Sequence, residues 1–385
     1  MGLANAASIA DLALLAKRRL PAFVFNYIEG GAGDGAGVAR NAAAYRRHVF
    51  TVKRLAGLAT DAAFELFGRS YRRGFAVAPI GMANLAWPGA DLILARLAER
   101  ENIPYVLSTA GTTSIEKIAA AAPSVAWFQL YMSRDDAITR DMVRRAWDAG
   151  MRVLVFTVDV PAPSRRNRGI RDGFTLPFRF TGRVLMDLAA HPSWSLATLR
   201  AGMPSLETYA QYAKSESLQA VGRFIAQLNK HGLDWDDLAS VRAQWRGALV
   251  VKGILEPADA MAALRAGADG IWVSNHGGRQ LESAPASLDR LAPIRAAVGA
   301  AVPVLFDGGI AGGEDVIKAM ALGASMVFSG RSFAYGVGAG GARGADKAFE
   351  ILSREIMAAL HQIGCPSLKA ADRTILAAGA CHSMR

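Results

Sequence analysis

The 385-residue sequence contains only two cysteines, Cys365 and Cys381, and neither lies at a spacing that zinc or iron–sulfur sites use. We therefore expect no metal site, no disulfide framework and a reducing compartment. No apolar run reaches the roughly 18 to 20 residues that a membrane-spanning helix needs. The N-terminus also lacks the basic residues that precede the apolar part of a secretory signal. Together these absences predict a cytoplasmic location.

The sequence also has fewer acidic residues than basic ones. Asp and Glu total 33 against 44 Lys and Arg, which gives a formal net charge of +11. This excess favours anionic partners, such as a phosphate-bearing cofactor, an acidic substrate or an anionic membrane surface. Nucleic acid is not expected, because the sequence has no Cys/His finger, no RNA-binding aromatic motif and no basic heptad segment.

Short apolar segments alternate with longer amphipathic stretches from residue 74 onward, which is typical of repeated β/α units. Three of the predicted helices end at a glycine, Gly150, Gly267 or Gly323, that lies seven residues before the end of the next strand. Eight units predict an α/β fold, a (β/α)8 TIM barrel. The strands are expected at residues 75–78, 105–107, 126–130, 153–158, 249–251, 271–273, 302–306 and 326–328.

The barrel is preceded by an N-terminal segment with a helix predicted at 8–20, capped by Ser8 or Asp11 and stopped at Pro21. Residues 35–70 are expected to form a connector. We predict a single domain, divided into an N-terminal segment (1–73), the barrel (74–160 and 248–360), a long insertion after strand four (161–247) and a C-terminal tail (361–385).

The insertion is far longer than an ordinary strand-to-helix connection. It begins with a basic run at 165–171 and continues with interleaved Trp, Leu and Arg residues. Two interpretations fit this composition: a lid over the active site, or a surface for peripheral membrane contact through residues 165–215.

Polar or special residues lie at the carboxyl end of every predicted strand, where TIM barrels place their chemistry. The central example is segment 274–281, in which His276 and Arg279 are separated by two glycines. A neutral imidazole can accept a proton, and a guanidinium can hold a carboxylate through two hydrogen bonds. The remaining strand ends supply Pro79, Ile80, Gly81, Ser108, Gln129, Tyr131, Thr157, Asp159, Lys252, Ser274, Asp307, Gly308, Gly309, Gly330 and Arg331.

Two glycine-rich loops, 307–313 and 329–331, follow predicted strands seven and eight. Their backbone N–H groups could turn toward an anion, and a helix beginning near Glu314 would add its dipole, so we expect a phosphate site there. Lys252 would be buried at the end of strand five and would need a negative partner. A phosphate-bearing cofactor whose ring accumulates negative charge is one interpretation, and Schiff-base chemistry is the other.

Segment 274–281 resembles the signature of the FMN-dependent L-2-hydroxy acid dehydrogenases and oxidases, a family that includes glycolate oxidase, L-lactate dehydrogenase and (S)-mandelate dehydrogenase. The resemblance extends from about Ile9 to about Ala370, and the insertion, through 191–196 and 202–204, is most similar to the mandelate and lactate dehydrogenase branch. It implies FMN as cofactor, a homotetramer, and oxidation of an L-2-hydroxy acid to the 2-oxo acid. Electrons would pass to a quinone or another carrier.

The resemblance also assigns roles to the strand-end residues. His276 would be the base, Asp159 would pair with its imidazolium, and Tyr131 would hydrogen-bond the substrate hydroxyl. The substrate carboxylate would be bound by Tyr27, Arg166 and Arg279, with His276 and Tyr131 completing the substrate site. FMN would contact Pro79, Ile80, Gly81, Ser108, Gln129, Thr157, Lys252, Ser274, Asp307, Gly308, Gly309, Gly330 and Arg331.

Three positions depart from the family pattern. Ala311 stands where an Arg is usual, so phosphate binding would depend more on Arg331 and on backbone amides. Ala110 replaces the Trp of glycolate oxidase, and Gly81 replaces an Ala common in oxidases, so the pocket is expected to be wide. This favours a mandelate-like substrate, with lactate second. The alternatives are a soluble oxidase that makes hydrogen peroxide and a non-catalytic barrel that binds phosphorylated ligands.

Overall fold

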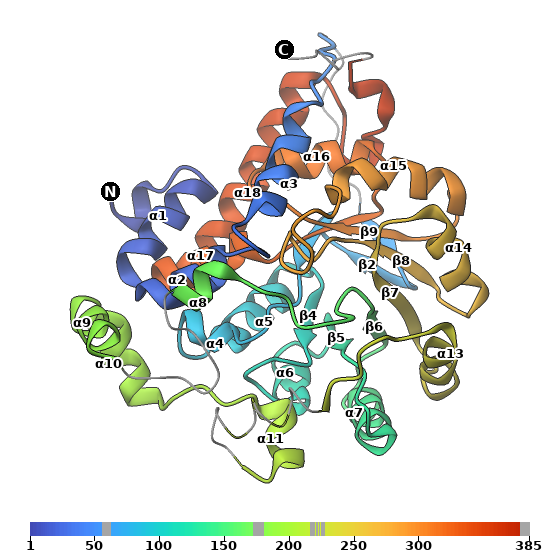
Figure 1. The fold of residues 1–385 in the computed structure, drawn as a ribbon. Coiled ribbons are helices and arrows are strands. Elements are labelled where there is room, and N and C mark those ends of the chain that lie inside the picture. The colour runs from blue at the N-terminus through green and yellow to red at the C-terminus, as the bar shows by residue number, and fades with distance from the viewer. Residues whose placement is uncertain are drawn as a thin grey trace.

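The computed structural model describes residues 1–55, 63–171, 181–215, 220, 222, 224 and 228–377. Its centre is a closed barrel with strand order β10-β3-β4-β5-β6-β7-β8-β9, in which every neighbouring pair is parallel (Figure 1). All eight strands fall where the alternation of apolar and amphipathic segments predicts them, so the TIM-barrel prediction is confirmed. They are β3 (Phe75–Val77), β4 (Tyr105–Ser108), β5 (Ala126–Leu130), β6 (Val153–Thr157), β7 (Ala248–Ile254), β8 (Gly270–Val273), β9 (Val304–Asp307) and β10 (Met326–Ser329).

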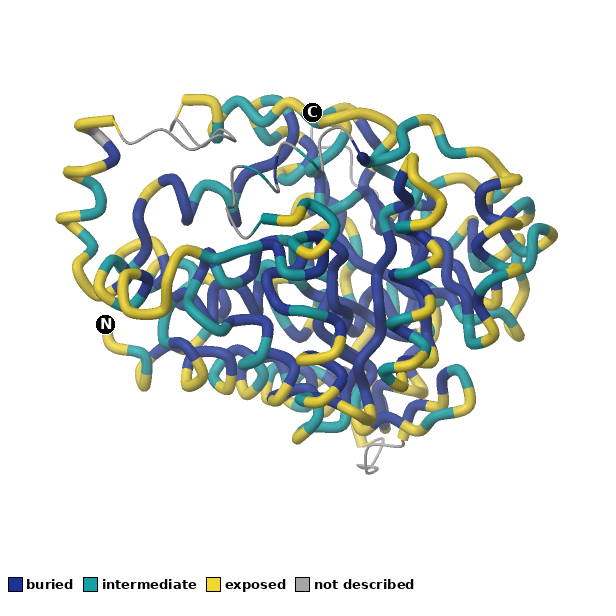
Figure 2. Tube along the Cα trace, turned by 90° about the horizontal axis from the view of Figure 1, so that it is seen from below, coloured by how far each residue is buried: buried dark blue, intermediate teal, exposed yellow. Residues whose placement is uncertain are grey.

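The strands are buried on both sides, as a barrel with a packed interior and an outer ring of helices requires. The tube coloured by burial is mostly dark blue at the centre of the molecule (Figure 2). Among the barrel strand residues, Ala248 and Gly253 in β7 are the two that are partly accessible. The surrounding helices are α4 (Ala83–Ala86), α5 (Ala90–Glu101), α6 (Ile115–Ala121), α7 (Asp136–Asp148), α13 (Trp235–Gln244), α14 (Pro257–Arg265), α15 (Ser287–Val298), α16 (Gly313–Ala321), α17 (Arg331–Gly340) and α18 (Ala342–Ile363).

The N-terminal helix α1 (Ile9–Arg19) is confirmed, with Ser8 as its cap and Asp11 completing a capping box. Pro21 then caps α2 (Ala22–Glu29), and α1 packs against α17. Short 3-10 turns lie near both ends of the described chain: η1 (Leu3–Asn5), η2 (Leu368–Ala370) and η3 (Arg373–Ile375).

The stretch 35–70, for which only a connector is predicted, has regular secondary structure. This stretch contains α3 (Ala36–Arg46) and most of a hairpin, β1 (Phe64–Leu66) and β2 (Arg69–Tyr71). Helix α3 has a glycine rather than a capping side chain at its start, which removes the usual sequence signal. The hairpin covers the amino-terminal end of the barrel, because the ring of Phe67 at its turn packs against Trp127 near the start of β5.

The insertion forms α8 (Asn167–Arg171), α9 (Gly182–Ala190), α10 (Pro192–Ala201) and α11 (Glu207–Ala213). Helices α9 and α10 stand at the edge of the molecule, away from the barrel (Figure 1). The predicted basic and membrane segment at 165–215 includes residues 172–180, which lie outside the described residues, as does Cys381. In the part of the chain that is described, no helix is long and apolar enough to cross a bilayer. The division into one domain with these boundaries stays a prediction.

One buried side chain attaches α10 to the body of the protein. The ring of Trp194 packs edge-on against Phe23 of α2, and its Nε1 donates to the carbonyl of Leu85, 2.9 Å away. Asp187 of α9 adds a second link by accepting a hydrogen bond from the backbone N–H of Ala22. The edge helices therefore have a fixed attachment even though most of their surface is exposed.

Candidate functional site

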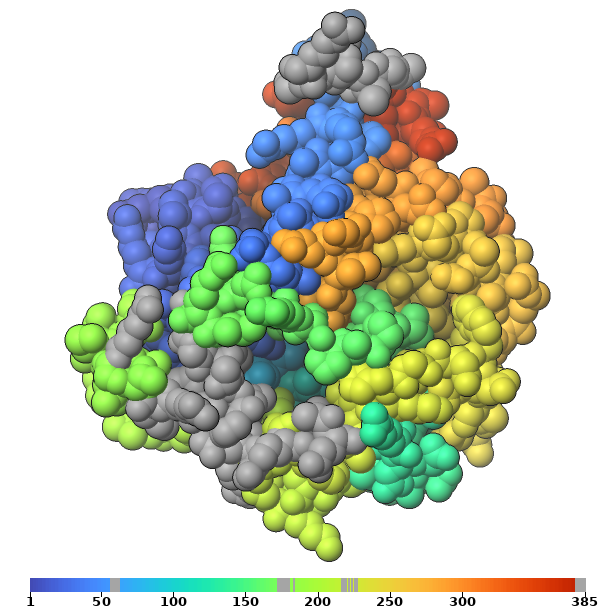
Figure 3. Space-filling model, viewed as in Figure 1, coloured from blue at the N-terminus to red at the C-terminus, as the bar shows by residue number. Residues whose placement is uncertain are grey.

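The carboxyl ends of the barrel strands enclose a cavity of about 330 Å³, and the surface is hollowed below α8 (Figure 3). Nearly all of the residues predicted to form the site line this cavity. They are Tyr27, Pro79, Ile80, Gly81, Ser108, Gln129, Tyr131, Thr157, Arg166, Lys252, His276, Arg279, Asp307, Gly308, Gly309, Gly330 and Arg331. The other two, Asp159 and Ser274, lie behind the wall, and each hydrogen-bonds to a lining residue.

His276 lies between a carboxylate and a phenol. Its Nδ1 is 2.9 Å from Oδ1 of Asp159, and its Nε2 is 3.3 Å from the hydroxyl of Tyr131. An ionised carboxylate can only accept hydrogen bonds, so Nδ1 carries the proton and the lone pair of Nε2 is directed to the cavity side. This is the arrangement that a general base needs.

The electrostatics of this pair agree with a neutral base. Burial lowers the pKa of His276, and the opposing charge of Asp159 only partly offsets that effect. For Asp159, burial alone would raise the pKa, but the interactions with His276 and Lys252 outweigh burial and lower it. At neutral pH the imidazole is therefore uncharged beside an ionised carboxylate.

The loop that carries His276 is held in an uncommon conformation. His276 has φ of +58°, in the left-handed region that residues with a side chain seldom adopt. Its backbone N–H donates to Ser274 Oγ at 2.9 Å. The side-chain amide of Asn275 forms a reciprocal pair with Asn41 of α3 at 2.7 and 2.8 Å, and also accepts from the N–H of Gly278. Sequence reasoning missed the role of Asn41, because nothing in the sequence marks α3 as a neighbour of this loop.

Lys252 has the negative partner that its burial requires. Its ammonium is 3.3 Å from Asp307 Oδ2 and donates to Ser274 Oγ at 2.9 Å, while the Ser274 hydroxyl donates to Asp307 Oδ1 at 2.6 Å. The Lys252 side chain is only 4% exposed. The Lys252 nitrogen is therefore already engaged by Asp307 and Ser274, an arrangement that does not favour its use as a nucleophile in Schiff-base chemistry.

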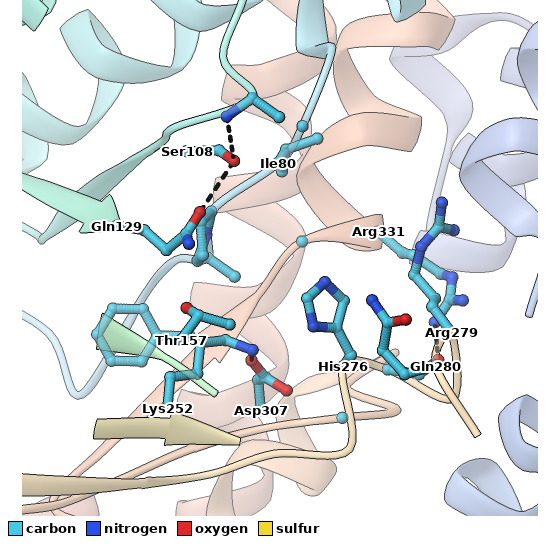
Figure 4. Close-up of a pocket in the computed structure, with 18 of the residues that line it drawn as sticks. Ile80, Ser108, Gln129, Thr157, Lys252, His276, Arg279, Gln280, Asp307 and Arg331 are labelled. Atoms are coloured by element: carbon cyan, nitrogen blue, oxygen red, sulfur yellow. Dashed lines mark hydrogen bonds and ion pairs between the residues drawn. The ribbon is translucent and has the colours of Figure 1, made fainter. Parts of the chain in front are cut away.

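Arginine side chains gather at the other end of the cavity, opposite Ser108, Gln129 and Lys252 (Figure 4). Arg279 and Arg331 both donate to the carbonyls of Ile28 and Gly30, at the C-terminal end of α2. Such carbonyls favour cations.

The arginine cluster still carries excess positive charge. Burial first, and the charges of Arg166 and Arg331 second, lower the pKa of Arg279 to about 9. Nε of Arg166 is buried without a hydrogen-bond partner among the described residues, whereas Arg165 is exposed and does not line the cavity. The geometry therefore favours Arg166 over Arg165 as part of an anion site.

The glycine-rich loop after β9 is tightly built. Gly308 has φ of +121°, and a Cβ there would lie 2.2 Å from Oγ of Ser287, so only glycine fits. The N-terminus of α16, however, already has carboxylate partners: Gly313 N–H donates to Glu355 and Ala311 N–H donates to Asp315. The expected contribution of this helix to a phosphate site is therefore not supported, and the start of α17 at Arg331 is the helix terminus that lines the cavity.

The opposite wall is suited to a heteroaromatic ring. Nε2 of Gln129 and Oγ1 of Thr157 are buried and have no hydrogen-bond partner in the described chain. The Ser108 hydroxyl donates to Oε1 of Gln129 at 3.0 Å, which fixes the amide with Nε2 free (Figure 4). Together with Lys252, these unsatisfied groups form a row of polar atoms that a flavin ring with hydrogen-bonding edges would satisfy. The residues present therefore fit FMN.

Comparison with known proteins gives a consistent result. The family model described as FMN-dependent dehydrogenase matches residues 16–378. (S)-Mandelate dehydrogenase from Pseudomonas putida is 37% identical over 94% of this chain and 92% of that protein. L-Lactate dehydrogenase from Pseudomonas syringae pv. syringae is 36% identical over 96% of this chain and 98% of that protein. A crystal structure of the monotopic membrane protein (S)-mandelate dehydrogenase superposes with a TM-score of 0.94 at 36% identity, covering 97% of this chain and 99% of that one.

Proposed function

The chain belongs to the FMN-dependent dehydrogenase family, and from that membership we propose that its substrate is a mandelate-like L-2-hydroxy acid, with lactate as the second candidate. The family oxidises 2-hydroxy acids with bound FMN, so the chain is an oxidoreductase acting on CH–OH and FMN is its cofactor. The alternative of a non-catalytic barrel is thereby wrong.

One observation carries the assignment of residues: His276 Nε2 faces the same cavity as Arg279 and Arg166. A 2-hydroxy acid has its carboxylate one bond from the carbon that bears the hydroxyl. We assign the carboxylate to the two arginines and to Tyr27, whose ring lies 5.2 Å from the Arg279 guanidinium. The hydroxyl then lies at the imidazole, where the buried Asp159 stabilises the imidazolium that forms.

Tyr131 completes the substrate site. Its hydroxyl is 3.3 Å from His276 Nε2, and burial raises its pKa, so it stays protonated and can donate to the substrate oxygen. When bound, FMN supplies the two-electron acceptor that no side chain provides. The residues that would hold it are Pro79, Ile80, Gly81, Ser108, Gln129, Thr157, Lys252, Ser274, Asp307, Gly308, Gly309, Gly330 and Arg331.

The preference for a mandelate-like side chain is supported by two small residues that face each other. A Cβ built on Gly81 would lie 3.5 Å from the Cβ of Ala110 and 3.5 Å from the hydroxyl of Tyr27. A methyl group at residue 81 would therefore already contact its neighbours, and larger side chains at residues 81 or 110 would narrow the cavity. With small residues at both positions, an aromatic substrate ring can bury far more apolar surface in the cavity than the methyl group of lactate does.

We also propose that electrons pass to a membrane quinone or another carrier, and that residues 165–215 make peripheral contact with the inner face of the cytoplasmic membrane. Met186 of α9 and Leu199 of α10 are 70% and 79% exposed, and Leu185 and Met203 are exposed beside them. Apolar side chains on helices at the edge of a basic protein suit an anionic bilayer surface. A homotetramer, which light scattering of the purified protein would test, is the proposed assembly.

Anaerobic flavin reduction tests the activity. Purified protein supplied with FMN is expected to be bleached rapidly by (S)-mandelate, slowly by L-lactate and not at all by (R)-mandelate. Reoxidation by a quinone analogue that is faster than reoxidation by oxygen supports the dehydrogenase, and the reverse order supports the oxidase that makes hydrogen peroxide. Protein that binds FMN but is bleached by none of these acids contradicts the proposed substrate class.

A further inference from the structure

Asn229 is a polar residue of the cavity wall that has no part in the reaction proposed above. It belongs to a short segment that is fixed to the loop after β5. The backbone N–H of Arg134 donates to the carbonyl of Leu228 at 2.7 Å, and the N–H of Lys230 donates to the carbonyl of Met132 at 2.9 Å. This pairing, centred on a bridge between Ser133 and Asn229, holds Asn229 close to the strand end that carries Tyr131.

The orientation of the Asn229 amide is fixed by a buried phenol. Tyr209 of α11 is only 1% exposed, and its hydroxyl donates to Oδ1 of Asn229 at 3.3 Å. Tyr209 is also near Tyr131, because it adds to the effect of burial in raising the pKa of that residue. With Oδ1 engaged, Nδ2 is the polar atom left for a ligand, and no described residue accepts a hydrogen bond from it.

The cavity offers few other uncommitted polar side chains. Ala110 and Val160, which also line it, are apolar. His276 and Tyr131 act at the substrate hydroxyl, and the arginines act at its carboxylate. The amide of Gln280, a further lining residue, lies at this reacting end, between His276 and Arg279 (Figure 4). Asn229 is therefore an uncommitted donor that a substrate side chain extending from the reacting carbon can meet.

We propose that Asn229 is a specificity-determining residue that selects 2-hydroxy acids whose side chain carries a hydrogen-bond acceptor at its far end, such as a ring hydroxyl. This inference rests on the proposed function and specifies its substrate class further. An unsubstituted ring would remove water from the amide without replacing the lost hydrogen bond, whereas a hydroxylated ring would replace it. One such hydrogen bond is expected to be worth about tenfold in kcat/KM.

The test compares matched substrates on the FMN-loaded full chain. We would measure kcat/KM for (S)-mandelate, its 3- and 4-hydroxy derivatives, and the 3- and 4-methyl derivatives, which have similar size but cannot accept a hydrogen bond. At least one hydroxy derivative is expected to exceed its methyl counterpart by about tenfold. Asn229→Leu is expected to bring that ratio close to one. The control variant Gln362→Leu, which deletes an amide group on the exposed face of α18, is expected to leave the ratio unchanged.

The outcomes separate this inference from the proposed function. If none of the mandelates is oxidised, the proposed function fails, and this inference fails with it. If the mandelates are oxidised but the unmodified chain shows no preference for either hydroxy derivative over its methyl counterpart, the role of Asn229 is overturned while the activity stands. That role is equally overturned if the preference persists in Asn229→Leu. Should that variant not fold, Tyr209→Phe replaces it, because loss of the phenol frees the amide to turn and is expected to reduce the same ratio.

Discussion

Oδ1 of Asp159 lies 2.9 Å from Nδ1 of His276, and this contact determines which imidazole nitrogen can act on a substrate. Asp159 does not line the cavity, so it acts through the imidazole alone. Its second oxygen, Oδ2, is buried without a hydrogen-bond partner among the described residues. The carboxylate is therefore incompletely satisfied in the resting protein, and a positive charge on the imidazole would stabilise it further.

Asp159→Asn is expected to lower kcat by on the order of a hundredfold or more, because the amide cannot stabilise the imidazolium and can favour the other tautomer. FMN content should not change, since residue 159 lies behind the cavity wall. The acid limb of the pH profile should move to lower pH, because Asp159 raises the pKa of His276 and its charge is lost. Stopped-flow flavin reduction across pH measures both effects. A limb that moves to higher pH would contradict the assigned pairing.

In the unmodified protein, the acid-side fall of the kcat/KM pH profile should be centred at a pH below the ordinary histidine pKa of 6.5. Burial lowers the pKa of His276, and only the neutral imidazole accepts a proton. Activity is therefore expected to persist as pH falls through 6.5 and to be lost once pH falls through the lowered pKa. An acid-side fall centred clearly above pH 6.5 would show that another group controls the reaction.

His276→Asn should retain FMN while flavin reduction slows by roughly a thousandfold or more. Asparagine suits this position because it tolerates the left-handed backbone that His276 adopts better than most residues do. The flavin absorbance reports retention, and its rate of bleaching by (S)-mandelate reports turnover. His361→Asn, an exposed change on α18, is the matched control. Normal turnover in the His276 variant would remove that residue as the base.

The sequence predicts much of this site because strand ends in a TIM barrel converge. The alternation of apolar and amphipathic segments locates all eight strands. The structure has a positive φ at Gly150, Gly267 and Gly323, as expected of glycines that end helices. Once the strands are placed, Ser108, Gln129 and Lys252 must lie at one end of the barrel. This inference needs no knowledge of loop paths.

The remaining features depend on loop paths, which local patterns do not encode. Asn41 reaches Asn275 from a helix that lacks a capping signal, and Asn229 enters the cavity through backbone pairing with the loop after β5. The carboxylates that pair with the start of α16 come from α18 and from within α16 itself. Each contact joins segments whose proximity only the folded chain determines, so sequence periodicity could not predict it.

Lys252→Met should destabilise the protein by about 3 kcal/mol or more, because the buried carboxylate of Asp307 would lose its cation. FMN binding should weaken as well, since a positive charge is removed from the ring wall. Thermal unfolding of the FMN-free protein and titration with FMN measure the two effects separately. Adding Asp307→Asn should recover part of the stability. A single variant as stable as the unmodified chain would show that the ion pair has no net role.

The exposed apolar residues of the insertion are expected to contact the membrane. Replacing both Met186 and Leu199 by Asp should reduce pelleting with anionic lipid vesicles several-fold, because charged side chains resist burial at the bilayer interface. FMN content and mandelate turnover should be unchanged, since both side chains lie on the edge helices and neither lines the cavity. Met261→Asp on α14, on the other side of the molecule in Figure 1, controls for added negative charge. Equal pelleting of the double variant and the unmodified chain would exclude this surface as the membrane contact.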